Sequence, residues 1–382
     1  MPEIDKNANL PHFQRKIISE YLEQNDEFYN WIKDIFKITS IELNNEDYKI
    51  FEEIKLNIAN INNFPLELSM LERLFLDRNR ANSEKCIEYL IFRYKLRVFP
   101  RKKIASSFPA YLLIEPVSAC NLRCVMCFQI DKSFTKKPYM GVMSLELFKK
   151  IIDEAVAGGT RAITMASRGE PTLNRDLPKM LEYTKDKFFE VKINTNGTRL
   201  TEELCHTILG TGVTELVFSI DAEHKDLYER IRVRGKFDTV IKNIKMFNEI
   251  RQASYPDSDI VTTASGVFFH EEQDIEKYTN FFTKIVDQVA AVAMENRWDT
   301  YANELHPEET APCEYLWQRM YVWFDGKCNP CDVDYKSYLK VGDVNKRSIK
   351  DIWNGELYKK LRNDHYNKKR NNHSPCDRCG VY

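Results

Sequence analysis

Six short β-rich runs alternate with amphipathic helices between residues 111 and 294, and this alternation restricts the fold more than any other feature. The runs that we expect to form strands are 111–118, 161–167, 190–197, 215–221, 259–269 and 288–294. Ser144 is the expected N-cap of the first intervening helix, and Gly158 is its expected stop. Because short βα connections require parallel strands with right-handed crossovers, the chain should form an open doubly wound sheet or an incomplete barrel. In either fold, chemistry belongs at the carboxyl ends of the strands.

The remainder of the chain lacks this alternation. Residues before about 105 are expected to be mostly helical, because apolar side chains recur there at helical spacing. In the first such stretch these side chains are Phe13, Ile17, Tyr21, Phe28, Trp31, Ile32, Ile35 and Phe36. We therefore expect four segments, which are a helical domain over 1–105, the βα core over 106–295, a linker over 296–312 and a cysteine-rich domain over 313–382.

The charge balance and the absence of long apolar runs narrow the range of partners. Lys and Arg number 56 against 57 Asp and Glu, so nothing electrostatic favours nucleic acid or an anionic membrane. No apolar run approaches the roughly 20 residues of a membrane span, and the polar start of the chain does not resemble a signal peptide. We therefore expect a cytoplasmic protein, whose ten cysteines are metal ligands or reactive thiols rather than disulfides.

Three of these cysteines, Cys120, Cys124 and Cys127, follow the first expected strand with the spacing C-x3-C-x2-C. Thiolates are soft ligands that suit iron–sulfur clusters, zinc and copper(I). A structural zinc site is normally closed by four ligands. Three thiolates can instead hold three corners of a [4Fe-4S] cluster, which leaves the fourth iron open to a ligand that is not protein.

This loop, placed after the first strand of a βα chain, resembles that of the radical S-adenosylmethionine (SAM) superfamily. The resemblance implies an incomplete (β/α)6 TIM-like barrel and a [4Fe-4S] cluster whose open iron binds the amino and carboxylate groups of SAM. It also implies reductive cleavage of SAM to methionine and a 5′-deoxyadenosyl radical, which abstracts a hydrogen atom from a substrate carbon. A flavodoxin- or ferredoxin-type protein would supply the electron.

Later strand ends are similar to other segments of the family. "SRGEP" resembles its G-G-E-P segment, with Arg168 in place of the first glycine and Glu170 as the expected acceptor for the SAM amino group. Arg232, rather than Arg230, is expected near the SAM carboxylate, and Met126 or Phe128 beside the adenine. The other implied contacts to SAM are Gly169, Asn194, Asn196, Ser219 and Asp221. "GEP" and "TNG" are also ordinary turn sequences, but their order along successive strand ends favours the cofactor site.

The C-terminal cysteines form a second group that suits zinc or an iron–sulfur cluster. Their layout resembles the SPASM domain and its shorter twitch form, a small α+β domain in which Gly326, Gly342, Ser348 and Trp353 match recurrent positions. The resemblance implies one auxiliary [4Fe-4S] cluster held by Cys313, Cys331, Cys376 and Cys379.

Three cysteines remain outside these two sets. Cys328 is off-pattern, and we weigh three roles for it: a spare thiol, a ligand in place of Cys331, or a hydrogen-atom donor. Cys205 and Cys86 lie among apolar helical residues and are expected to be buried structural thiols, with Cys205 as a second candidate donor. An oxidation would also need a base, and the polar candidates are His270, Glu295, Asp299, His306, Asp332 and Asp334.

The chain is thus expected to be an oxidoreductase or epimerase that acts on a carbohydrate- or aminocyclitol-like small molecule, because no clear winged-helix peptide-binding domain precedes the core. A peptide or protein maturase is the alternative. An RNA-modifying enzyme is disfavoured by the neutral charge balance. A non-enzymatic zinc scaffold is the remote alternative, and the missing fourth ligand of the three-cysteine loop argues against it.

Overall fold

The structure is a computed structural model, and it describes residues 14–15, 26–37, 41–58, 66, 68–293 and 299–380. Its strands are β1 Gln14–Arg15, β2 Tyr111–Ile114, β3 Ala162–Met165, β4 Glu190–Thr195, β5 Glu215–Ser219, β6 Val261–Phe268, β7 Gln288–Ala293, β8 Arg319–Val322, β9 Lys327–Asn329 and β10 Gly342–Asp343. They form one sheet in the order β1-β7-β6-β5-β4-β3-β2-β8-β9-β10.

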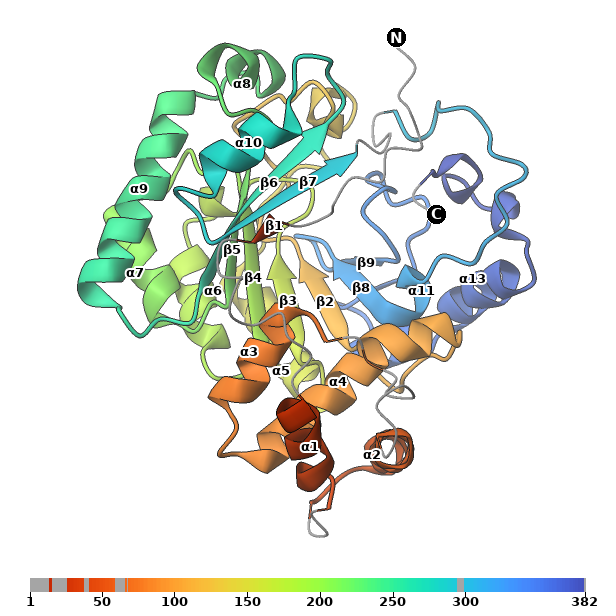
Figure 1. The fold of residues 1–382 in the computed structure, drawn as a ribbon. Coiled ribbons are helices and arrows are strands. Elements are labelled where there is room, and N and C mark those ends of the chain that lie inside the picture. The colour runs from red at the N-terminus through yellow and green to blue at the C-terminus, as the bar shows by residue number, and fades with distance from the viewer. Residues whose placement is uncertain are drawn as a thin grey trace.

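Strands β2 to β7 are parallel, each to the next, and they form the core of the molecule (Figure 1). Within the described sheet, β7 pairs with β1 on its outer edge, and β2 pairs with β8, so β7 and β2 do not close on each other. This arrangement confirms the incomplete barrel and rejects the doubly wound order.

Helices lie on the outside of these strands, and α7 Glu202–Gly210 and α9 Phe237–Ser254 run along one side in Figure 1. The core helices are α5 Leu145–Gly158, α6 Leu177–Thr184, α7 Glu202–Gly210, α8 Lys225–Ile231, α9 Phe237–Ser254 and α10 Ile275–Phe282. Ser144 caps α5 as expected, since its hydroxyl accepts from the Leu147 N–H at 3.2 Å. The expected stop at Gly158 is confirmed, because α5 ends at that residue. Gly159 follows as the C-cap with a φ of 89°, a left-handed conformation that glycine adopts readily.

The two faces of the sheet differ in polarity. On the outer face Ile114, Ile163 and Ile193 are fully buried beneath the helices. Strand residues one position away point to the opposite face, so Lys192 lies inside the barrel, where it forms an ion pair with Glu215 at 2.9 Å. The alternation therefore places a polar lining inside an apolar shell.

Four helices precede the core and pack on one another around a second hydrophobic cluster. They are α1 Asp26–Ile35, α2 Asn45–Asn57, α3 Met70–Arg78 and α4 Ser83–Arg101. The expectation of a helix that continues from Phe13 is wrong at Gln14–Arg15, because these residues pair with the edge of β7 as strand β1. An edge strand offers unpaired backbone groups, and an added strand satisfies them. Phe13, Ile17 and Tyr21 lie outside the described residues.

The C-terminal region continues the sheet of the core. Its helices are α11 Tyr315–Gln318, α12 Ile349–Trp353 and α13 Glu356–Tyr366, with short 3₁₀ turns at Arg370–Asn372 and Cys376–Arg378. Strand β8 is parallel to β2, and β9 returns antiparallel through a turn at Gly326, whose φ is 84°. Trp353 is fully buried and donates to the Ser106 carbonyl at 2.7 Å, which fixes α12 against the core. In the described part of the chain, no helix combines the length and the apolar character that crossing a membrane requires.

Candidate active site

The three-cysteine loop follows β2 and is held by backbone hydrogen bonds to the last residue of α8 and to the segment after it. The Arg123 N–H donates to the Val233 carbonyl at 2.9 Å, and the Val125 N–H donates to the Ile231 carbonyl at 3.0 Å. Between them, Cys124 is buried. This pairing fixes the loop at the carboxyl edge of the strands, where the sequence analysis placed it.

The three thiols lie close enough to influence one another. Burial, followed by the neighbouring Cys124 and Cys120, raises the pKa of Cys127 to about 12. Burial also raises the pKa of Cys120 to about 11. Since buried thiols without a counter-charge stay protonated, they need a bound cation to become thiolate ligands.

This donor set consists of three thiols, and thiolates are the soft ligands that a [4Fe-4S] cluster takes. Cys120, Cys124 and Cys127 would hold three of its corners.

The segment after β3 approaches this loop closely. A Cβ added to Gly169 would lie 2.2 Å from the Val117 carbonyl oxygen, so only glycine fits there. The next residue, Glu170, donates its backbone N–H to the Ala119 carbonyl at 2.9 Å. The glycine is therefore required by the contact between this segment and the start of the cysteine loop.

The Glu170 carboxylate is buried and braces neighbouring strand ends. Its Oε1 accepts from the Thr195 hydroxyl at 2.6 Å and from the Thr172 hydroxyl at 2.7 Å. Its Oε2 accepts from the Asn196 N–H at 2.7 Å. Burial raises the pKa of Glu170, against the effect of these donors. One acceptor position on Oε2 remains for a further donor, consistent with the expected amino group.

The expected polar contacts of β4 and β5 lie along the same edge. The Asn196 amide donates to Asn121 Oδ1 at 2.9 Å, beside Cys120. The Asn194 Oδ1 atom is buried without a hydrogen-bond partner in the described structure. Ser219, at the end of β5, is in register with Ser265 of β6. The edge thus offers amide and hydroxyl groups beside the cysteine loop.

The structure separates the two arginine candidates. Arg232 is buried, and its Nε donates to Asp221 Oδ2 at 2.5 Å. Burial raises the pKa of Cys124, and the adjacent Arg232 opposes that effect. Arg230 instead forms an exposed ion pair with Glu272. Arg232 is therefore the arginine beside the cysteine loop.

Phe128 and Met126 have different surroundings. The Phe128 ring stacks on Tyr335, with centroids 4.7 Å apart and an interplanar angle of 11°, and it meets the edge of Phe134. Met126 is half-buried and packs on the main core. Phe128 is therefore engaged by an aromatic cluster and Met126 by the main core, and the contact of either residue with the adenine stays a prediction.

Arg168 makes contacts that the sequence analysis did not anticipate. It is buried, and its Nε and Nη2 donate to the two carboxylate oxygens of Glu115 at 2.7 and 2.5 Å. Its Nη1 donates to the Tyr335 carbonyl at 2.9 Å, and its guanidinium lies 4.2 Å from the Trp323 ring centroid. These contacts connect the ends of β2 and β3 to the C-terminal region. The signal in the sequence was an arginine at a position where the family has glycine.

The four cysteines expected to hold the auxiliary cluster also come together. Burial raises the pKa of Cys313 to about 11, with Cys379 contributing. Burial likewise raises the pKa of Cys331, with Cys376 as the next cause. Arg370 donates to the carbonyls of Cys376 and Cys379 at 3.1 and 2.7 Å. This donor set fits a cluster, and Arg370 fixes the C-x2-C segment.

The three spare thiols lie in hydrophobic cores. Cys328 is fully buried on β9, where its Sγ lies 3.8 Å from the Gly326 carbonyl oxygen. Cys205 is fully buried in α7, and Cys86 is buried among the N-terminal helices. Neither candidate hydrogen-atom donor is brought to the carboxyl edge of the strands.

Removing Cys331 and Cys328 separately tests which of the two is a ligand of the auxiliary cluster. Cys331→Ala is expected to remove the auxiliary cluster, so that iron falls from about eight to about four per chain. Cys328→Ala is the matched control and is expected to keep about eight irons, because its thiol does not face the other three cysteines. Iron analysis of anaerobically reconstituted protein measures both, and the reverse pattern would assign Cys328 as the ligand.

The residues considered as candidate bases lie in different parts of the structure and have different partners. Asp299 and Asp334 accept hydrogen bonds from Tyr335 and Tyr301 at 3.2 and 2.7 Å. Burial, with Asp332 as the next cause, raises the pKa of Tyr321 on β8. The two histidines, His270 and His306, lie in loops beside Glu272 and Glu308, and Glu295 lies outside the described residues.

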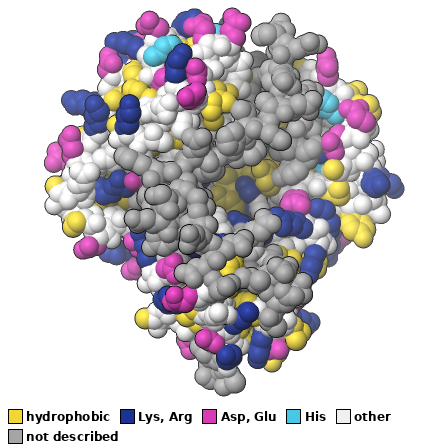
Figure 2. Space-filling view, in the orientation of Figure 1, with side chains coloured by type: hydrophobic (Ala, Val, Ile, Leu, Met, Phe, Trp, Pro, Cys, Tyr) yellow, Lys and Arg dark blue, Asp and Glu magenta, His cyan; other side chains and the backbone are white. Residues whose placement is uncertain are grey.

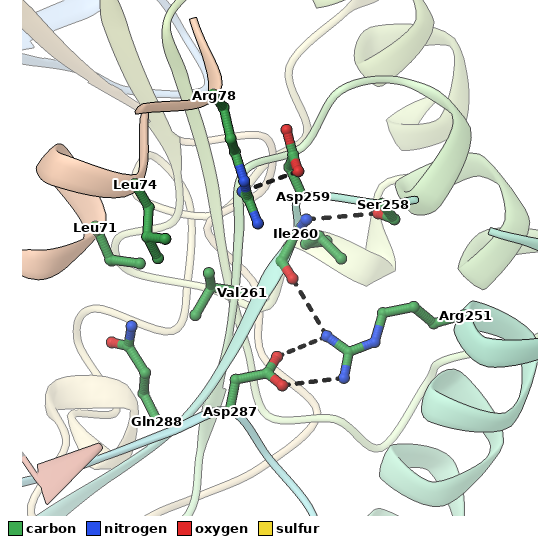
Figure 3. Close-up of a pocket in the computed structure, with 10 residues that line it drawn as sticks. All are labelled: Leu71, Leu74, Arg78, Arg251, Ser258, Asp259, Ile260, Val261, Asp287 and Gln288. Atoms are coloured by element: carbon green, nitrogen blue, oxygen red, sulfur yellow. Dashed lines mark hydrogen bonds and ion pairs between the residues drawn. The ribbon is translucent and has the colours of Figure 1, made fainter. Parts of the chain in front are cut away.

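The described cavities lie toward the amino ends of the strands. A chamber of about 770 Å³ is lined by Tyr111, Lys192 and Arg319 on the barrel side and by α3 and α4 on the other. Figure 2 shows that this face of the molecule is hollowed near its centre. A smaller cavity of about 150 Å³ lies beside it (Figure 3), where Arg251 pairs with Asp287 at 2.6 Å. The charged side chains that line this cavity, Arg251 with Asp287 and Arg78 with Asp259, form ion pairs with each other. We therefore regard the cavity as part of the packing and not as a binding site.

Comparison with known proteins supports two domain assignments. Residues 114–282 match the model of the radical SAM superfamily, and residues 313–380 match SPASM, an iron-sulfur cluster-binding domain. GTP 3',8-cyclase from Desulforamulus reducens is 29% identical over 44% of this chain, and the match spans only 51% of that relative.

Two solved structures share the fold. BtrN in complex with AdoMet and 2-DOIA has a TM-score of 0.51 at 18% identity, over 72% of this chain and 94% of its own. Streptococcus suis SuiB bound to precursor peptide SuiA has a TM-score of 0.54 at 16% identity, over 86% of each chain. At such identities the likeness concerns the fold alone.

Proposed function

We propose that this chain, a radical SAM protein with a C-terminal SPASM domain, oxidises a carbon of a polar, carbohydrate- or aminocyclitol-like small molecule. The two domains imply SAM, a [4Fe-4S] cluster that cleaves it reductively to give a 5′-deoxyadenosyl radical, and auxiliary iron–sulfur chemistry. The residues of both cysteine sets fit these groups. Four auxiliary ligands in one set favour a single auxiliary cluster.

The observation that favours oxidation over epimerisation is the position of the cysteines. An epimerisation must return a hydrogen atom to the substrate, commonly from a thiol. All ten cysteines lie in the described part of the chain. Seven belong to the two cluster sets, and Cys86, Cys205 and Cys328 are buried in hydrophobic cores. No thiol is therefore left to face a substrate, whereas an auxiliary cluster is available to accept the second electron.

The polarity of the barrel lining supports a polar substrate. The inner positions of the strands include Thr164, Asn194 and Ser265, beside the Lys192–Glu215 ion pair. Hydroxyl and amide groups in a largely enclosed site recognise hydroxyl and amino groups of a ligand. The described N-terminal region consists of helices α1 to α4 and strand β1, which gives no support to a winged-helix peptide-binding domain. A peptide maturase remains the alternative, because the same fold binds a peptide in SuiB.

A product analysis tests this proposal. Reduced protein, SAM and a panel of aminocyclitols, sugars and short peptides are incubated without oxygen in D₂O. We expect substrate-dependent 5′-deoxyadenosine and a product that is two hydrogens lighter than the substrate. Cys205→Ala and Cys328→Ala should form the same product. An inverted product that carries one solvent deuterium, and that disappears in either variant, would contradict the proposal and establish epimerisation.

A further inference from the structure

A buried ion pair between Arg232 and Asp221 lies beside the three-cysteine loop. The Arg232 Nε donates to Asp221 Oδ2 at 2.5 Å, and both residues are buried. Asp221 is itself fixed, because its Oδ1 accepts from the Val267 N–H at 2.9 Å and its carbonyl accepts from the Gln273 side chain at 2.7 Å. Both carboxylate oxygens of Asp221 are thus engaged within the chain, and one of them holds Arg232.

Arg232 lies opposite the middle cysteine of the loop. The two backbone hydrogen bonds that join the loop to the end of α8 and the segment after it flank Cys124 on one side and Arg232 on the other. Cys124 and Arg232 are only 7% and 8% exposed. Because bulk water is largely excluded from both residues, solvent ions screen their interaction little.

The charge of Arg232 acts on all three cysteines of the loop. Burial raises the pKa of Cys120, of Cys124 and of Cys127, and Arg232 opposes this effect at each of them. At Cys124, Asp221 acts in the same direction as burial. Arg232 is therefore a buried cation that favours the thiolate form of the whole cysteine set, and Asp221 partly offsets it.

We propose that the Asp221–Arg232 pair sets the reduction potential of the [4Fe-4S] cluster on the cysteine loop. Arg232 is a counter-charge to the cluster thiolates, and Asp221 is the positioning residue that fixes this charge and partly offsets it. Reduction of such a cluster adds one negative charge, so a fixed positive charge nearby favours the reduced form. Net charge and groups outside the ligand shell are known determinants of cluster potentials.

This inference rests on the part of the proposed function that places a SAM-cleaving cluster on the cysteine loop, and it does not depend on the substrate. It differs from the expected contact of Arg232 with the SAM carboxylate, because that contact acts only when SAM is bound. The effect of the ion pair on the potential should be present without SAM. It concerns the first step of the reaction, since the cluster must be reduced before SAM is cleaved.

A redox titration of SAM-free protein tests the inference. Electron paramagnetic resonance (EPR) spectroscopy measures the midpoint potential of the cluster in the unmodified protein, Arg232→Met, Arg232→Lys and Asp221→Asn. The relevant cluster is the one whose EPR signal changes when SAM is added to a separate sample. Arg230→Met removes an exposed arginine two residues away, which pairs with Glu272, and is the matched control. The auxiliary cluster is an internal control in every sample.

We expect Arg232→Met to lower the equilibrium constant for one-electron reduction at least about tenfold, which is a fall of about 59 mV in the potential. Arg232→Lys should lie between this variant and the unmodified protein, because it keeps the charge but not the planar fork. Asp221→Asn should raise the potential, because the buried guanidinium keeps its charge and loses the carboxylate that offsets it. Arg230→Met and the auxiliary cluster should keep the unmodified potentials.

Shifts in the same direction in Arg232→Met and Asp221→Asn would indicate a general loosening of the site and would overturn the inference. An unchanged potential in Arg232→Met would overturn it as well. If Arg232→Met does not retain its cluster, the sign of the shift in Asp221→Asn decides. The absence of any EPR signal that responds to SAM in the unmodified protein would instead contradict the proposed function.

Discussion

Cys124→Ala is expected to abolish the formation of 5′-deoxyadenosine. Cys124 is buried between two backbone hydrogen bonds that fix the cysteine loop. Loss of a group that only orients a ligand costs about 10–100-fold, so loss of the ligand itself should exceed about 1,000-fold. Iron should fall from about eight to about four per chain, because the auxiliary site is unchanged. Chromatography of the nucleoside and iron analysis measure the two effects.

A matched variant controls for the loss of a thiol. Cys205→Ala removes a fully buried thiol from α7 and should keep both the iron and the activity. If the variant at Cys124 retained full iron and SAM cleavage, the three-cysteine loop would not be the cluster site. Anaerobic protein that is colourless and binds stoichiometric zinc would support the scaffold alternative.

Arg168→Met is expected to lower the free energy of unfolding by about 3–5 kcal/mol, which is typical when one partner of a buried ion pair is removed. Glu115 would then remain buried without its counter-charge, and the Tyr335 carbonyl and the Trp323 ring would lose their contact with the guanidinium. Urea unfolding of the reconstituted protein, followed by tryptophan fluorescence, measures the change. Arg175→Met, at an exposed position, is the control and should differ from the unmodified protein by less than about 0.5 kcal/mol.

A double variant distinguishes the ion pair from a general loss of packing. In Glu115→Gln/Arg168→Met no buried carboxylate lacks a counter-charge, so part of the lost stability should return. Equal destabilisation in the single and double variants would show that the charge of Glu115 is not the cause. Arg168→Gly, which introduces the usual glycine of the segment, should be as unstable as Arg168→Met, because Glu115 stays unpaired.

The sequence predicted the parts of the fold that depend on local pattern. The β and α periodicities identified the six core units, and short-range hydrogen bonding identified Ser144 as a cap. The spacing of the cysteines grouped them into two sets, and the thiols of each set lie close enough in the structure to influence one another. Their role as cluster ligands stays a prediction. Local pattern failed at β1, since the pairing of Gln14–Arg15 with β7 depends on a strand more than 270 residues away.

Long-range contacts account for the other differences. The partners of Arg168 lie 53 and 167 residues away, so the sequence could mark the arginine as unusual but could not identify what it binds. Cys328 and Cys331 lie three residues apart, and only the direction of each side chain places Cys328 in the hydrophobic core and Cys331 beside Cys376 and Cys379. The stacking of Phe128 on Tyr335, which lies more than 200 residues away, could not be predicted from the sequence either.

The pairing of β8 with β2 makes the C-terminal region inseparable from the core. A chain truncated before residue 313 would expose the whole side of β2 as an unprotected edge, with the apolar run of Leu112, Leu113 and Ile114 beside it. Such edges recruit strands of other molecules and cause aggregation. The radical SAM core would therefore be a poor candidate for isolated expression or for transfer to another protein.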